Sequence, residues 1–409
     1  MTTSPTLRRS LNLPLVVLYG LGNILGAGIY VLIGKVAGQA GYLAPFSFLV
    51  ASLIAGITAF SFSELSSRFP VSAGEAVYIR EGFRIPQLSL AVGLLIILTG
   101  VVSAATMTKG FIGYLNVFIE LPPALVVIGL LAILCIVAVW GIAESVSFAA
   151  AFTVLEIAGL LLVLFVTMPV LEQLPARRAE FTPTLDLSAW MGVFGGAFLA
   201  FYAFVGFEDM VNLAEEVKDS KRNLPIAILL SMAIATVIYI LIALNSVLIL
   251  SPEELRQSNS PLSDIYLAAT SNNPWFISVV SLCAVINGAL IQIIMGSRVA
   301  YGLAKQGLIS PLLGRVNSYT QTPIVSTAAI TLVTIIAALW LPLETLARTT
   351  SYLLLVLFCL VNLALIRIKR RDPVDPVTFT VPNYIPAVGF VSCALFLGLQ
   401  TWSVLSKLI

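Results

Sequence analysis

Histidine is absent from this chain of 409 residues, and charged residues are few. Histidine is the usual proton carrier near neutral pH, so any proton transfer would fall to carboxylates, lysine or tyrosine. Only 10% of the residues are charged, whereas about a quarter are charged in a typical soluble domain. Together with 59% hydrophobic residues and a mean hydropathy of +1.02, this composition predicts an integral membrane protein.

Cysteine is scarce too, and the four that are present lie in apolar runs without a Cys-x-x-Cys pair; they are Cys135, Cys283, Cys359 and Cys393. We therefore expect no disulfide, no metal and no cofactor. The net charge of +2 is small and dispersed, which argues against a nucleic-acid partner. A membrane enzyme is not expected either, because the chain lacks histidine, a cysteine pair and paired intramembrane carboxylates, so no catalytic residue is predicted.

Eleven apolar stretches have about the 20 residues that a bilayer core requires. They are 11–34, 42–63, 86–108, 121–139, 149–170, 189–213, 224–250, 275–300, 322–342, 345–367 and 384–406. If the N-terminus is cytoplasmic, 15 of the 22 lysines and arginines fall on the cytoplasmic side. Because positive residues concentrate there, we expect a multi-pass protein of the cell (inner) membrane with its N-terminus in the cytoplasm.

Two of these stretches carry glycines at mid-membrane depth. Five glycines lie between Gly20 and Gly34, and each costs a helix roughly 0.5 to 1 kcal/mol relative to alanine, so Gly26-Ala27-Gly28 marks a point where the helix opens easily. A second interrupted stretch follows at Gly192–Asp209. Glycines also serve helix packing, but paired broken helices in corresponding positions of two halves indicate a transporter site near the bilayer midplane.

Several motifs resemble those of the amino acid-polyamine-organocation (APC) transporters, in the right order over nearly the whole chain. They are residues 26–30 (GAGIY), 64–75 (ELSSRFPVSAGE), 201–208 (FYAFVGFE) with 214–218 (AEEVK), and 296–298 (GSR) with 301–304 (YGLA). The resemblance implies an all-α, LeuT-like membrane fold with two inverted five-helix repeats, discontinuous helices 1 and 6, and one additional helix. One transport domain would then span residues 1–409, with repeats at about 11–170 and 189–367 and the extra helix at about 384–406.

The two breaks together predict an amino acid site. Freed amides of the first break would bind the substrate carboxylate, and freed carbonyls of the second would accept the ammonium. Aromatic rings of the sixth span would form a wall and a gate, although such rings are also common in packing and lipid contacts. The predicted substrate-binding residues are Ile24, Gly26, Ala27, Gly28, Ile29, Phe201, Ala203, Phe204, Gly206 and Phe207, with Tyr202 as a gate residue.

Glu156 lies well inside the fifth span, where an ionisable group is a functional hypothesis by default. Several proton-coupled members of the resembled family carry a lysine at what corresponds to this place, so Glu156 reverses the sign of the charge there. We expect Glu156 to load and release the coupling proton. A structural glutamate is the alternative. Glu208 and Asn287 are candidate gate residues. Sodium coupling is less expected than proton coupling, because 286–292 lacks the paired hydroxyls that sodium would need.

The sequence therefore predicts a permease, a secondary active transporter, working by proton-coupled symport of neutral amino acids with alternating access. Exchange of amino acids or amines is an alternative. Transport of cationic amino acids or polyamines is another, but it calls for a further acid at the pocket, and the sequence points to none. A channel, from a different functional class, would need a continuous polar or charged ring.

Overall fold

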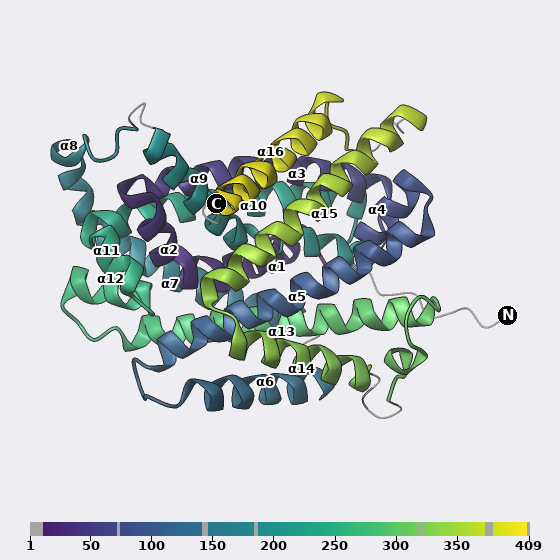
Figure 1. Ribbon diagram of the computed structural model, residues 1–409, viewed down its shortest axis with the longest axis horizontal. Helices are drawn as coiled ribbons and strands as arrows, with labels where there is room; N and C mark the ends of the chain where they lie inside the picture. The colour runs from purple at the N-terminus through teal and green to yellow at the C-terminus, as the bar shows by residue number, and fades with distance from the viewer. Residues whose placement is uncertain are drawn as a thin grey trace.

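The computed structural model describes residues 11–71, 74–140, 146–183, 187–317, 320, 322–372 and 379–406. These residues form an elongated bundle of helices, without a named strand in the described ranges (Figure 1). The helices are α1 (Leu13–Leu25), α2 (Ala27–Ala40), α3 (Ala44–Arg68), α4 (Gly74–Phe83), α5 (Pro86–Leu115), α6 (Pro123–Trp140), α7 (Val146–Thr167), α8 (Leu174–Arg177), α9 (Leu187–Phe201), α10 (Ser220–Ile249), α11 (Pro252–Gln257), α12 (Pro261–Thr270), α13 (Trp275–Lys305), α14 (Ile324–Trp340), α15 (Leu343–Arg371) and α16 (Tyr384–Leu405).

Each of the eleven predicted spans coincides with a helix or with a broken helix. Within the described residues, nine helical stretches are long and apolar enough to cross a membrane, and α1 and α14 are shorter apolar helices. The first span comprises α1 and α2, and the sixth comprises α9 with two 3₁₀ turns, η4 (Tyr202–Phe204) and η5 (Glu208–Leu213). The predicted all-α membrane fold with interrupted first and sixth spans is confirmed.

The broken spans lie in the middle of the bundle. Helix α1 packs on α7 and α10, α2 packs on α9, and α5 runs along α13. Helices α6 and α14 pack on each other at one edge, and α16 lies at the opposite edge (Figure 1). Exposed apolar residues such as Ile133 on α6 and Leu332 on α14, each 59% exposed, face outward as expected for lipid contact.

The two ends of the bundle carry different elements. We call the end where α1 begins the N-terminal face; α4 lies there, and α11 and α12 lie at the opposite end (Figure 1). Helix α1 starts where it does because the side chain of Asn12 caps it by accepting from the amide of Leu15 at 3.1 Å, with a proline at the second helical position.

A short backbone pairing, which we call the N-terminal strap, joins Leu11 to the segment after η5. The amide of Leu11 donates to the carbonyl of Glu216 at 3.1 Å, and the amide of Lys218 donates to the carbonyl of Leu11 at 2.9 Å. The start of the first span is therefore hydrogen-bonded to the end of the sixth span, although they are about 200 residues apart in sequence.

A buried ion network links α3 to α15 on the N-terminal face. The carboxylate of Glu64 is fully buried and pairs with Arg68 at 2.6 Å and with Lys369 at 2.8 Å. It also accepts from the amide of Val381 at 2.9 Å, in the segment before α16. All the charge on Glu64 is thus compensated inside the protein, and three parts of the chain meet at one side chain.

Candidate functional site

The first span is interrupted at Gly26. Helix α1 ends at Leu25 and α2 begins at Ala27, with Gly26 at φ −50° and ψ −139° between them. Since the last carbonyls of a helix and its first amides have no partners within that helix, the break leaves both kinds of group available. The negative end of α1 and the positive end of α2 consequently lie one residue apart.

The sixth span is interrupted just after Phe201. Helix α9 gives way to the 3₁₀ turn η4, and Gly206 takes a φ of +115°, which favours glycine over residues with a side chain. This break lies against the first one. A Cβ added to Gly28 would lie 2.4 Å from the Cα of Ala203, and one added to Gly206 would lie 2.8 Å from the carbonyl carbon of Asn23.

Tyr239 of α10 joins the two breaks through its hydroxyl. Its Oη lies within hydrogen-bonding distance of the carbonyl oxygen of Ile24 and 2.9 Å from that of Ala203. A phenol has one proton, so it donates fully to only one of the two carbonyls. Two carbonyls from different broken helices thus converge on a point where an ammonium group, with three N–H donors, would satisfy both.

The predicted residues of the first break surround the start of α2. Gly28 and Ile29 lie in its first turn and are buried, and Ile24 is buried at the end of α1. The backbone of Ala27 begins the helix, while its side chain lies outside the described residues. The first amides of a helix favour a negative group, so the start of α2 can bind a carboxylate.

The four predicted aromatic residues do not form one wall. The ring of Phe204 packs against Tyr239, with centroids 5.1 Å apart, and the hydroxyl of Tyr202 lies 3.1 Å from that of Ser103 on α5. Phe201 and Phe207 instead contact Phe358 of α15, at 5.7 and 5.2 Å between centroids. Of these four residues, only Phe204 has a ring contact with Tyr239 among the contacts of the described residues.

Glu156 and Asn287, predicted from separate spans, lie side by side. Glu156 is fully buried on α7, and the amide of Asn287 on α13 donates to its Oε1 at 3.3 Å. The other carboxyl oxygen, Oε2, is buried without a hydrogen-bond partner. Tyr30 of α2 donates to the backbone carbonyl of Glu156 at 2.8 Å, which places the carboxyl next to the first broken span.

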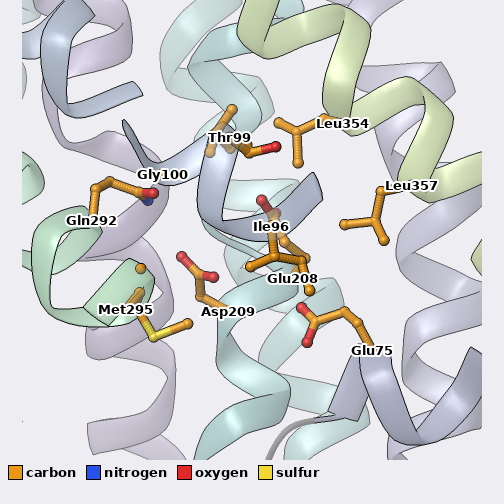
Figure 2. Close-up of a pocket in the computed structure, with 12 residues that line it drawn as sticks. Glu75, Ile96, Thr99, Gly100, Glu208, Asp209, Gln292, Met295, Leu354 and Leu357 are labelled. Atoms are coloured by element: carbon orange, nitrogen blue, oxygen red, sulfur yellow. The ribbon is translucent and has the colours of Figure 1, made fainter. Parts of the chain in front are cut away.

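Glu208 caps the second break. Its Oε2 accepts a hydrogen bond from the amide of Gly206 at 2.9 Å. Next to it, a small cavity of about 20 Å³ is lined by Glu208, Asp209 of η5, Glu75 of α4 and Gln292 of α13, among others (Figure 2). Glu75 lies outside the membrane spans, and burial raises its pKa from 4.5 to about 8.

Comparisons with known proteins fit this geometry. The profile of one protein family, described as amino acid permease, matches residues 11–406. The chain belongs to the amino acid permease family. It is a transporter of the APC superfamily and not an enzyme. It is a multi-pass membrane protein, and its substrate is a small molecule.

Individual relatives of this permease carry different solutes. A branched-chain amino acid permease of Bacillus subtilis is 28% identical over 97% of this chain and 88% of its own length. A vacuolar cationic amino acid transporter 2 of Arabidopsis thaliana is 27% identical over 94% of this chain but only 64% of its own length. A methylthioribose transporter of Bacillus subtilis is 26% identical over 96% of this chain and 88% of its own length.

Four residues at the candidate site were not predicted from the sequence. Tyr239 lies in an apolar span that also contains Ser231, Thr236 and Asn245, and nothing local marks it as the partner of the breaks. Asn23 lies within the glycine-rich stretch, and both its amide nitrogen and its amide oxygen are buried without a partner. Glu75 and Asp209 were not expected near the site, and only the adjacency of Asp209 to Glu208 hinted at it.

Proposed function

We propose that the permease carries neutral amino acids by alternating access, in symport with protons and with its N-terminal face in the cytoplasm. The observation that carries the proposal is the convergence of the carbonyls of Ile24 and Ala203 on the hydroxyl of Tyr239, beside the first turn of α2. An α-amino acid has an ammonium and a carboxylate on one carbon. This arrangement places carbonyl acceptors for the ammonium close to amide donors for the carboxylate.

The substrate side chain would meet apolar surfaces. Ile24, Ile29 and Phe204 are buried around the breaks, and within the described residues the hydrogen bonds and ring contacts of Tyr239 involve no charged side chain. This environment favours a neutral apolar side chain. The similarity to a branched-chain amino acid permease supports the same choice.

Coupling to protons is assigned to Glu156. An ionised carboxylate at this position would leave the buried Oε2 without a partner, and an unpaired buried charge is costly. A proton removes the charge, and release of the proton when water enters would follow the opening of the site. Since Tyr30 of α2 is hydrogen-bonded to the backbone of Glu156, movement of the first span would also move the surroundings of the carboxyl.

The transport reaction is tested by counterflow of labelled leucine in proteoliposomes that contain the purified protein. A carrier gives saturable, transient accumulation of label, whereas a channel gives none. Preloading with each of the twenty amino acids and with putrescine then ranks the substrates. Uptake that requires a second substrate inside, regardless of any proton gradient, would replace symport by exchange.

The coupling role is tested with Glu156→Gln. We expect leucine accumulation driven by an inside-alkaline pH gradient to fall by at least tenfold, because the amide cannot carry the proton, while counterflow at constant pH persists. Glu172→Gln, an exposed glutamate near the end of the same span, is the matched control and should behave as the wild type. Unchanged proton-driven accumulation in Glu156→Gln would make Glu156 a structural residue.

A further inference from the structure

A second cavity, of about 450 Å³, lies away from the broken spans, and we call it the edge cavity. It is enclosed by the ends of α6 and α13 and by the start of α14, at the edge of the bundle where α6 packs on α14 (Figure 1). The wall residues that matter for its chemistry are Ser297, Arg298, Tyr301, Val316, Thr322 and Thr327. A cavity of this volume is large enough for a small molecule or a lipid headgroup.

The edge cavity reaches the surface of the protein near the boundary of the membrane. Val316, one of its wall residues, is 45% exposed. Trp140, the last residue of α6, is 66% exposed, and tryptophan is enriched where a membrane protein meets the headgroup layer. Farther along the same helices the outward side chains are apolar, such as Ile136 on α6 and Leu332 on α14. A headgroup in the cavity therefore has lipid-facing surface next to it for its acyl chains.

The edge cavity is electropositive. Arg298 contributes an exposed guanidinium to its wall, and the ammonium of Lys305 lies 5.7 Å from the ring centroid of Tyr301. Residues 265–343 supply every described wall residue but one, and this segment contains three cationic residues and no acidic residue. A guanidinium has five N–H donors, so Arg298 can bind a phosphate oxygen and keep a contact within the protein.

The hydroxyl groups of the wall add hydrogen-bond acceptors beside this positive charge. Three of them donate their protons to backbone carbonyls: Ser297 to Ile294 at 2.8 Å, Thr322 to Val139 at 2.7 Å, and Thr327 to Pro323 at 3.1 Å. A hydroxyl that has donated its proton still has lone pairs to accept with. The wall therefore combines donors for an anion with acceptors for a hydroxylated group.

We propose that the edge cavity binds the headgroup of an anionic phospholipid that carries free hydroxyl groups, of the phosphatidylglycerol type. The phosphodiester would accept from Arg298 and Tyr301, and the glycerol hydroxyls would donate to the three wall hydroxyl oxygens. An ethanolamine or choline headgroup would place its positive charge beside Arg298 and Lys305, which disfavours it. The inference goes beyond the proposed function and does not depend on which solute the permease carries.

The experiment measures apparent Kd values from lipid-induced thermal stabilisation of the purified full chain in neutral detergent micelles. The probes are phosphatidylglycerol, phosphatidylethanolamine and phosphatidylcholine, all with oleoyl chains. We expect wild type to bind phosphatidylglycerol at least fivefold more tightly than the other two lipids. Arg298→Gln and Tyr301→Phe should each weaken phosphatidylglycerol binding at least threefold. The matched control is Arg370→Gln, an exposed arginine in the last turn of α15 on the N-terminal face, which should bind as wild type does.

Two further probes separate the parts of the lipid. Phosphatidic acid has the phosphate and the acyl chains but no glycerol headgroup, so Thr327→Val should weaken phosphatidylglycerol binding at least threefold and leave phosphatidic acid binding unchanged. Glycerol 1-phosphate has no acyl chains and should not stabilise the protein. Stabilisation by glycerol 1-phosphate equal to that by phosphatidylglycerol would replace the lipid with a water-soluble phosphate ester and overturn the inference.

The inference is also wrong if the three oleoyl lipids stabilise wild type equally, or if Arg298→Gln and Tyr301→Phe both keep the wild-type preference for phosphatidylglycerol. In either case the cavity holds water only. The variants are made separately, and each is first checked for a cooperative unfolding transition, so a protein that does not fold leaves the decision to the other variants.

Discussion

Tyr239 is the residue at which the two broken spans meet, and its hydroxyl takes the place that we assign to the substrate ammonium. One O–H lies within hydrogen-bonding distance of the carbonyls of both Ile24 and Ala203. Under the proposed function, the hydroxyl therefore occupies the position of the substrate ammonium. Its ring is held in place independently of the hydroxyl, by Phe204 at 5.1 Å and Phe48 at 5.8 Å between centroids.

We expect Tyr239→Phe to lower the stability of the empty carrier and to strengthen substrate binding. Loss of the hydroxyl removes the one donor shared by two buried carbonyls, at a cost of about 1 to 3 kcal/mol, and removes the group that competes with the ammonium. The melting temperature without leucine should fall, and the increase produced by saturating leucine should exceed that of wild type.

Tyr114→Phe is the matched control for this experiment. The Tyr114 hydroxyl also donates to a backbone carbonyl, that of Tyr30, at 2.6 Å, but the acceptor lies one turn into α2 and not at a break. This variant should lose stability with an unchanged response to leucine. A smaller leucine response in Tyr239→Phe would mean that the hydroxyl contacts the substrate directly instead of giving way to it.

The sequence predicted those residues of the candidate site whose signal is local and missed those whose signal is not. Gly26, Gly28 and Gly206 could be found because glycine in an apolar helix is informative by itself. Glu156 could be found because its depth in the membrane is unusual for a carboxyl group. Tyr239 could not, because its role depends on a contact with Ile24, 215 positions away, which only the folded chain reveals.

At the level of helices, hydropathy located every span but not the short elements between them. Helices α4, α11 and α12 have 10, 6 and 10 residues, too short to register as apolar stretches, yet α4 supplies Glu75. The sixth span shows a second limit. Its predicted wall residues, Phe201, Tyr202, Phe204 and Phe207, lie close together in sequence, but a 3₁₀ turn and a positive φ at Gly206 point them in different directions, so they do not share a face.

The contact between α3 and α15 should depend strongly on Glu64. We expect Glu64→Gln to reduce the free energy of unfolding by about 3 to 5 kcal/mol, because Lys369 and Arg68 would be left as nearly buried cations without their carboxylate. Chemical unfolding in mixed micelles measures this loss.

Glu344→Gln is the matched control for Glu64→Gln. Glu344 also pairs with an arginine four residues along its helix, Arg348, at 2.9 Å, but the Glu344 side chain is 49% exposed. An exposed pair of this type contributes at most about 1 kcal/mol. Similar losses in the two variants would show that burial of the Glu64 network does not determine its contribution.

For the molecule as a whole, the class, the approximate positions of the spans and the two breaks were predictable, because they follow from apolar length and glycine placement. The division into two inverted repeats stays a prediction. The N-terminal strap was not predictable, because it consists of backbone hydrogen bonds between distant segments. It ties the start of α1 to the end of the sixth span, so the halves of both broken spans on the N-terminal face are expected to move together.

Leu11→Pro tests this coupled movement. Proline has no amide hydrogen and cannot donate to Glu216, and loss of one backbone hydrogen bond, about 0.5 to 1.5 kcal/mol, should lower the maximal rate of counterflow about two- to tenfold. Leucine affinity should stay as in wild type. Leu11→Met, which keeps the amide and the side-chain volume, is the control; equal rates in Leu11→Pro and Leu11→Met would show that the strap does not influence transport.

The backbone nature of the strap has a consequence for how the permease tolerates mutation. Every residue except proline offers the same amide and carbonyl at position 11, so the two hydrogen bonds survive almost any exchange that fits the buried pocket of Leu11. Related chains could therefore diverge widely at this position and still keep the connection. Comparison of sequences would then show a variable residue at position 11, while the two backbone hydrogen bonds of the strap stay the same.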